Sequence, residues 1–181
     1  MKIYTTKEMF EEFGAKEASN KIHRFKCKPE KGIESDLKNR IVTSDIERNT
    51  TTHFILDDNN GYKILAFFTL KFDRIEDTLL GESILDRKSD DKFKSVYNIV
   101  YLARDDDAPK DNLRGNNLLD AAIEQIDETR NIVGGVNVVM IDAYTSKEKV
   151  CKIYEDYGFT KIPAIGETVN TMTHFFLKLK I

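Results

Sequence analysis

The first half of the chain carries hydrophobic positions in the spacing of short helices and strands. Thr5 and Glu8 have the separation of a capping box, which predicts that a helix begins there. Apolar side chains then recur every four residues from Ile33 to Ile41, which predicts a second helix. Two apolar runs flank Asp57–Gly61, whose Asp, Asn and Gly residues are typical of an antiparallel hairpin. The strands expected here are 2–4, 52–56 and 63–70.

The second half is predicted to follow the order strand, loop, helix, strand, helix, strand. Val96–Ala103 and Asn137–Ala143 are apolar enough to be buried strands, and residues 118–126 between them have one apolar helical face. A helix that joins two buried strands favours a parallel pair, so the whole sheet is expected to be mixed. A second helix ends at Gly158, and the last strand is expected at 171–180. The polar segment Arg74–Lys94 has no clear assignment, although a helix at 79–85 is one option.

Composition then limits the classes of protein. A chain of 181 residues with no repeat or linker predicts a single domain over 1–181. The formal net charge of −3 does not favour a protein that coats nucleic acid. The two cysteines form no CxxC pair, so neither a zinc cluster nor a disulfide framework is expected. No apolar run reaches the roughly 18 residues of a membrane span, and the N-terminus does not have the pattern of a signal peptide. We therefore expect a cytoplasmic α/β protein with no metal.

The segment Arg104–Leu119 contains the strongest candidate site. It joins a buried strand to the beginning of a helix through Arg114, Gly115 and the two asparagines that follow. Free N–H groups and the positive end of a helix dipole meet at such a position and can hold phosphate. A plain turn is the alternative interpretation. The segment is neither GxGxxG nor a P-loop, so it favours neither NAD nor ATP.

The order of these motifs resembles the GCN5-related N-acetyltransferase (GNAT) family. The family's loop usually reads Gln/Arg-x-x-Gly-x-Gly/Ala, and Arg114, Asn117 and Leu119 take its three fixed positions. The sequence Tyr154-x-x-Tyr157-Gly158-Phe159 is similar to the family's closing motif. Phe25-Lys26-Cys27 followed by a helix resembles a subgroup that includes the toxin-type acetyltransferases of bacterial toxin–antitoxin pairs.

The resemblance implies a mixed, mostly antiparallel sheet with a central splayed parallel pair flanked by helices. It also implies an acetyl-CoA-dependent N-acetyltransferase that uses direct transfer. Tyr154 would donate a proton to the leaving coenzyme A thiolate, although its apolar stripe also suits core packing. The residues expected to bind the cosubstrate are Leu102, Ala103, Arg104, Arg114, Gly115, Asn116, Asn117, Leu118 and Leu119.

The acceptor is less clearly indicated. No general base is evident, although His53 and His174 are on predicted strands. At pH 7 roughly one-tenth of an α-amine is neutral, against about one lysine in a few thousand, so an unassisted reaction favours an α-amine. We rank a small or macromolecular primary amine first. The α-amine of aminoacyl-tRNA is the alternative, for which the cations of Lys21–Lys31 could meet phosphates.

A non-catalytic GNAT-fold binding module is the second alternative. Two features favour this alternative. Leu119 stands where the family has a small residue, and the acidic run Asp105–Asp107 would repel a phosphate. Cys27 and Cys151 have no histidine at a recognisable spacing, so buried packing is expected for both. A homodimer is left open, and no membrane partner is expected.

Overall fold

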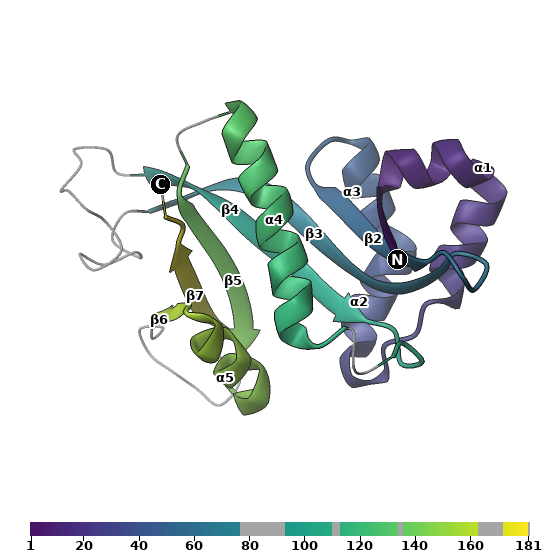
Figure 1. Cartoon of the computed structure of the whole chain (residues 1–181). Coiled ribbons are helices and arrows are strands. Elements are labelled where there is room, and N and C mark those ends of the chain that lie inside the picture. The colour runs from purple at the N-terminus through teal and green to yellow at the C-terminus, as the bar shows by residue number, and fades with distance from the viewer. Residues whose placement is uncertain (77–92, 110–112, 134–135, 163–171, 181) are drawn as a thin grey trace. The chain divides into compact units, whose positions relative to one another are not determined.

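One sheet of seven strands, in the order β1-β2-β3-β4-β5-β7-β6, is the main feature of the computed structural model of the chain (Figure 1). The structure describes residues 1–76, 93–109, 113–133, 136–162 and 172–180. The strands are β1 (Lys2–Thr5), β2 (Thr51–Asp57), β3 (Lys63–Glu76), β4 (Phe93–Arg104), β5 (Val138–Tyr144), β6 (Thr160–Ile162) and β7 (Met172–Lys178).

The described chain divides into two compact units. The first comprises Met1–Lys71 and Tyr101–Asp120, and the second comprises Phe72–Val100 and Ala121–Ile181. Strands β3 and β4 and the helix α4 (Gly115–Val133) each contribute residues to both units. The prediction of a single domain is not tested by this division and stays a prediction.

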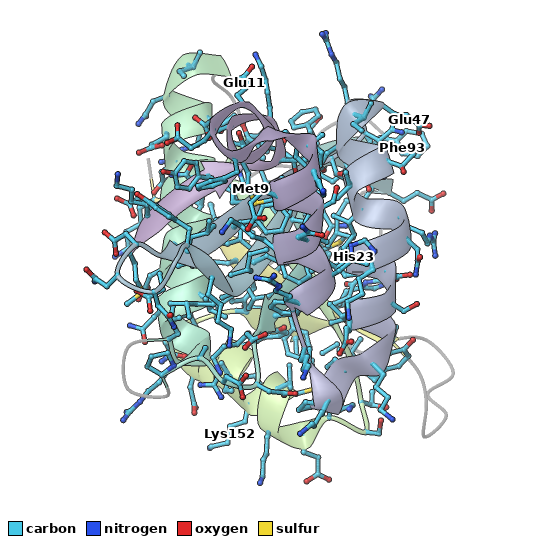
Figure 2. The ribbon with its side chains drawn as sticks, turned by 90° about the vertical axis from the view of Figure 1, so that its right-hand side faces the viewer. Met9, Glu11, His23, Glu47, Phe93 and Lys152 are labelled. Atoms are coloured by element: carbon cyan, nitrogen blue, oxygen red, sulfur yellow. The ribbon has the colours of Figure 1, made fainter. Side chains whose placement is uncertain are left out.

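The first unit is an antiparallel arrangement of β1, β2 and the first part of β3 (63–71), with helices around it. Its helical segments are α1 (Thr6–Arg24), a 3₁₀ turn η1 (Lys28–Glu30), α2 (Lys31–Asp36), a π-helix η2 (Leu37–Ile41) and α3 (Val42–Ile46). The predicted capping box begins α1, because the Glu8 N–H donates to Thr5 Oγ1 at 3.2 Å and the Thr5 N–H donates to Glu8 Oε2 at 2.7 Å. Met9 points from α1 into a core that contains Phe54 and Phe67, whereas Glu11 points outward (Figure 2).

The hairpin between β2 and β3 was predicted from its turn residues and is confirmed. Gly61 and Tyr62 have φ values of 60° and 55°, and the Lys63 N–H donates to the Asn60 carbonyl at 3.2 Å. Two successive residues with positive φ match a type I′ turn, whose twist suits a hairpin. The left-handed pair therefore begins at Gly61, and the bulky Tyr62 takes its second position.

The second unit contains the parallel pair. Strand β4 pairs with β5 from Tyr97↔Val139 to Ile99↔Ile141, and β4 continues beyond this ladder to Arg104. Strand β7 pairs antiparallel with both β5 and β6. Helix α5 (Glu148–Tyr157) ends at Gly158, whose φ of 112° is the left-handed cap that the sequence predicted.

The predicted fold class is confirmed by this mixed sheet and its β4–β5 pair. The structure differs from the prediction in several elements, and the 3₁₀ turn η1 and the helix α3 were not predicted. Helix α1 continues past a break at Gly14 (φ 74°), the second helix is divided by the π-helix η2, and β6 was not predicted. The option of a helix at 79–85 falls on residues outside the described part of the chain.

Candidate functional site

The end of β4 is held in place by a buried carboxylate. Asp105 is 1% exposed, and its N–H donates to the Leu65 carbonyl at 2.8 Å. Its Oδ2 accepts from the Lys26 N–H at 2.9 Å, and its Oδ1 lies 2.9 Å from Lys63 Nζ. A buried charge needs such partners. Asp105 therefore fixes both the strand end and the segment that begins at Lys26.

The acidic run after β4 is used by the protein itself. Asp106 accepts from the Lys28 N–H at 3.2 Å, and its own N–H donates to the Lys26 carbonyl at 2.9 Å. Asp107 Oδ2 lies 3.2 Å from Lys63 Nζ. The sequence predicts that this run repels a phosphate. The pairing of these carboxylates with N–H groups and with Lys63 offsets part of that repulsion.

The loop ends at the N-terminus of α4, as predicted. The Arg114 N–H donates to Asn117 Oδ1 at 3.0 Å, which is one half of a capping box. Arg114 occupies the N-cap position, and a guanidinium has no acceptor that could bind the first helical N–H groups. Gly115 adds no side chain above them, and Asn116 and Asn117 are exposed. This end of α4 suits an anion.

Leu118 and Leu119 follow with buried side chains, 3% and 0% exposed. Only their backbone could therefore contact a bound molecule. Because the Leu119 side chain is directed into the core, it does not crowd the loop in place of the family's small residue.

The first unit contains all nine of the predicted cosubstrate residues. Leu102, Ala103 and Arg104 end β4, and one Arg104 guanidinium nitrogen donates to the Leu113 carbonyl at 3.3 Å. That contact ties the strand end to the residue before Arg114. Residues 110–112 lie outside the described part of the chain.

Tyr154 belongs to the second unit. Its side chain is 6% exposed on α5, and its ring lies 5.4 Å from that of Phe175 in an edge arrangement and 6.0 Å from that of Phe159. An enclosed phenol of this kind suits both interpretations of the sequence, an acid in a dry site and a core residue.

The second unit also holds a polar pair that the sequence analysis did not join. His174 Nδ1 lies 2.7 Å from Asp142 Oδ1, because the two residues are directly opposite in the β5–β7 ladder. Both side chains are partly exposed. Of the other histidines, His53 is buried and stacks on Phe68, and His23 is exposed on α1. Only the register of the β5–β7 pairing reveals that Asp142 and His174 are neighbours, and this register could not be read from the sequence.

The basic segment from Lys21 to Lys31 is only partly available to a ligand. Lys21 is 8% exposed, donates to the Gly61 carbonyl at 2.6 Å and pairs with Glu17, so it does not belong to the exposed cluster that the sequence suggested. The exposed cations are Arg24, Lys26, Lys28 and Lys31. A cavity of about 260 Å³ beside them is lined by Lys21, Arg24, Phe25, Asn60, Gly61, Lys63 and Ile64.

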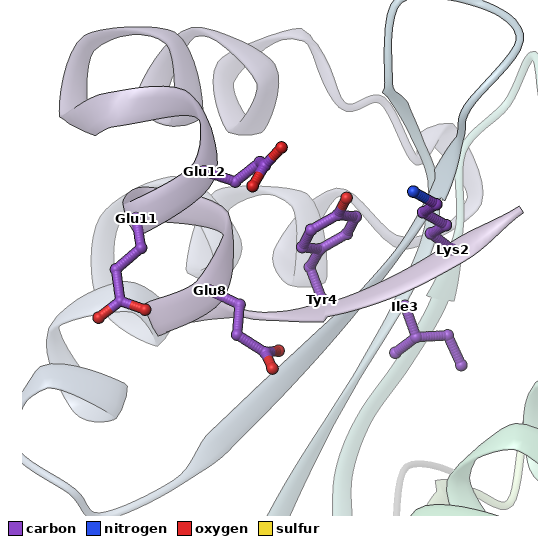
Figure 3. Close-up of a pocket in the computed structure, with 6 residues that line it drawn as sticks. All are labelled: Lys2, Ile3, Tyr4, Glu8, Glu11 and Glu12. Atoms are coloured by element: carbon purple, nitrogen blue, oxygen red, sulfur yellow. The ribbon is translucent and has the colours of Figure 1, made fainter.

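A second hollow lies between β1 and α1 (Figure 3). It is lined by Lys2, Ile3, Tyr4, Glu8, Glu11 and Glu12 and has a volume of about 510 Å³. None of the predicted site residues takes part in it. Its carboxylates make it unsuitable for a phosphate-bearing cosubstrate.

Within the described ranges, no group of three or more His, Cys, Asp or Glu side chains is arranged to hold a metal ion. No helix of the described part of the chain is long and apolar enough to span a membrane.

Solved structures with the same fold include toxins of toxin–antitoxin systems. The structure "AtaT complexed with acetyl-methionyl-tRNAfMet" is 19% identical, covers 98% of this chain and 94% of its own, and has a TM-score of 0.71. "Crystal structure of AtaTR bound with AcCoA" is 21% identical, with coverage of 87% and 86% and a TM-score of 0.65. A mutant of KacT is 14% identical, with coverage of 98% and 95% and a TM-score of 0.66. No protein-family model matches the sequence, and no curated protein matches it either. The chain thus has the GNAT fold.

Proposed function

We propose that the protein is an acetyl-CoA-dependent N-acetyltransferase and that the α-amine of aminoacyl-tRNA is its acceptor. The observation that carries the acetyl-CoA part is the end of β4 followed by the N-terminus of α4 with Arg114 at its cap. The structural neighbours favour the tRNA acceptor, which the sequence analysis ranked second, over an unspecified primary amine. The near-even charge balance, −3 overall, keeps a small amine as the second candidate.

In this proposal the first unit binds the cosubstrate. The backbone of Leu102–Arg104 would pair with the pantetheine arm, as a short strand pairs with a sheet edge. The N–H groups at the beginning of α4 and the Arg114 guanidinium would hold the pyrophosphate. A backbone N–H of β4 would also stabilise the tetrahedral oxyanion, and such donors contribute about 3–4 kcal/mol in other acyl-transfer enzymes.

The exposed cations of the first unit support a tRNA acceptor. Lys26 and Lys28 belong to a segment whose N–H groups are bound by Asp105 and Asp106, directly after the strand end that would hold the thioester. Their side chains are exposed and could contact phosphates near the reacting ester.

Tyr154 is the proposed acid for the thiolate. A thiol titrates near ~8.5 and a phenol near ~10, so proton transfer from Tyr154 to the departing sulfur costs little free energy. This role requires the Tyr154 hydroxyl to reach the sulfur of bound acetyl-CoA.

The test is a transfer assay followed by mass spectrometry. The protein is incubated with acetyl-CoA and one acceptor at a time. The acceptors are methionyl-tRNA, an amino-acid amide and a lysine side-chain analogue. We expect a mass increase of one acetyl group on the α-amine acceptors and the greatest kcat/KM with methionyl-tRNA. If no acceptor is acetylated and millimolar acetyl-CoA leaves the melting temperature unchanged, the chain is a binding module instead.

Matched charge variants separate the two sites. Arg114→Ala should weaken acetyl-CoA binding, whereas Lys152→Ala, which removes an exposed cation on α5, should not. Replacing Lys26 and Lys28 together by Gln should lower kcat/KM for methionyl-tRNA and reduce its salt dependence, but should leave the amino-acid amide unaffected. Equal effects on both acceptors would contradict a tRNA contact.

A further inference from the structure

A carboxylate and a phenol meet beside the end of β4 in the first unit. The Tyr101 hydroxyl donates to Asp36 Oδ2 at 2.9 Å, across 65 residues of sequence. Asp36 is the last residue of α2 and is partly exposed. Tyr101 directly precedes Leu102, and Figure 1 shows α2 beside this end of β4. The pair is therefore close to the strand segment proposed to hold the thioester.

The direction of the pair follows from strand alternation. Residues two apart on a strand point to the same face, so Tyr101 shares a face with Ala103. Ala103 is in a core cluster with Phe25, Leu37 and Ile41, and Tyr101 packs against that cluster. Asp36 therefore approaches β4 from the side of α2, and α2 directly follows the 3₁₀ turn Lys28–Glu30 in the chain.

The backbone beside Asp36 is unusual. The π-helix η2 begins at Leu37. π-Helical turns are rare in proteins, and those that do occur are often at functional sites. The buried Leu37 and Ile41 fix the two ends of η2, which in turn fixes the position of Asp36. Arg40 lies 3.5 Å from Asp36 Oδ1, but its side chain is 76% exposed, so this ion pair is weak and easily exchanged for another cation.

We propose that Asp36, oriented by Tyr101, binds the protonated amine of the acceptor and takes its first proton. This inference rests on the proposed acetyl transfer. The ammonium group would take the place of the Arg40 guanidinium at Oδ1, while the Tyr101 hydroxyl keeps Oδ2 in position.

The acceptor R–NH₃⁺ gives one proton to the Asp36 carboxylate, which passes it to water. The neutral nitrogen then forms the C–N bond at the thioester carbonyl, and its second proton leaves as the C–S bond breaks. The thiolate leaves as a thiol after it takes one proton, so the net products are the amide, coenzyme A and one proton in solution.

The groups around Asp36 are consistent with this role. Tyr101 on β4 and Arg40 on η2 are the titratable side chains recorded against its carboxylate in the described structure. Burial, followed by the hydrogen bond to Asp36, raises the pKa of Tyr101 above that of an ordinary phenol. Tyr101 therefore remains a donor over the pH range of an assay.

The test measures kcat/KM for an amino-acid amide with acetyl-CoA at pH 6.5 and pH 9. General acid–base groups contribute about 10²–10⁴-fold. We expect Asp36→Asn to lower kcat/KM at least about 100-fold at pH 6.5. At pH 9 an α-amine of pKa ~8 is already mostly neutral, so the loss should fall below about 10-fold. The KM for acetyl-CoA should not change.

Further variants separate a chemical role from a structural one. Asp36→Glu should recover part of the activity at pH 6.5, and Tyr101→Phe should raise the KM for the amine more than it lowers kcat. Glu11→Gln is the matched control, because Glu11 is also a helical carboxylate paired with a cation four residues away, Lys7. This variant should have the same kcat/KM as the wild type.

Three outcomes would overturn the inference. An equal loss at both pH values with a lowered melting temperature would make Asp36 a structural residue. A pH-dependent loss in His174→Asn and none in Asp36→Asn would assign the base to the His174–Asp142 pair. If the wild type transfers nothing and binds no acetyl-CoA, the proposed function fails and Asp36 loses its role with it.

Discussion

Single side chains determine the chemistry of the proposed reaction, and Tyr154 is the residue proposed to protonate the leaving sulfur. The family motif identified this residue from sequence, but its two roles could not be separated, because an enclosed phenol serves both. The pairs Asp36–Tyr101 and Asp142–His174 could not be predicted at all. Their members are 65 and 32 residues apart, and only the folded sheet brings them together.

Replacing Tyr154 by Phe tests the acid role. The ring and its packing on Phe175 and Phe159 are kept, and only the hydroxyl is lost. We expect kcat to fall about 100-fold, within the range of general acid catalysis, while the rise in melting temperature caused by acetyl-CoA stays the same. Unchanged turnover would assign Tyr154 to core packing alone.

The two cysteines should be unreactive in the native protein. Burial raises the pKa of both Cys27 and Cys151 above that of an ordinary thiol, and the Cys151 thiol donates to the Tyr144 carbonyl at 3.6 Å. Since the thiolate is the nucleophile, we expect iodoacetamide at pH 7.5 to label the folded chain at least about tenfold more slowly than the denatured chain. Mass spectrometry of both samples measures this, and rapid labelling of either cysteine would reopen a nucleophilic role.

At the scale of elements, the sequence predicted those features of helices and turns that depend on a few adjacent residues. The capping box of α1, the hairpin turn and the left-handed cap of α5 each depend on a few adjacent residues, and all three were predicted. Strand β6 was missed because it has only three residues, two of them exposed. The second part of α1 was missed because Gly14 interrupts the apolar pattern with a non-helical backbone.

Two glycines allow a matched test of backbone conformation. Gly158→Ala places a Cβ on a residue with φ of 112°, and the nearest atom, 3.8 Å away, leaves room for it. Strain alone should therefore destabilise the fold by about 1–2 kcal/mol. Gly32→Ala, within α2 and also without a clash, should stabilise it by about 0.5 kcal/mol. Urea unfolding of both variants measures the difference, and shifts of the same sign would contradict this account.

For the whole molecule, the fold class was predicted because the order of strands and helices leaves few topologies. The division into two compact units was not predicted. It arises where β3, β4 and α4 each pass from one unit to the other, and no change in composition marks those points.

The same three elements lead us to expect a single unfolding transition. Neither unit can lose β3, β4 or α4 without removing part of the other. Circular dichroism at 222 nm and tyrosine fluorescence should therefore give coincident urea curves with one midpoint. Two separated midpoints would show that the units unfold independently and would contradict the one-domain prediction.

Asp105 and Asp106 hold their neighbouring segment through the N–H groups of Lys26 and Lys28, not through the lysine side chains. Positions 26 and 28 can therefore accept almost any residue except proline, which lacks that N–H, while positions 105 and 106 cannot vary in the same way. The surface charge beside the end of β4 can thus change without a loss of the hydrogen bonds that hold the segment in place. Evolution or a protein engineer could change acceptor preference there, one lysine at a time, with little effect on folding.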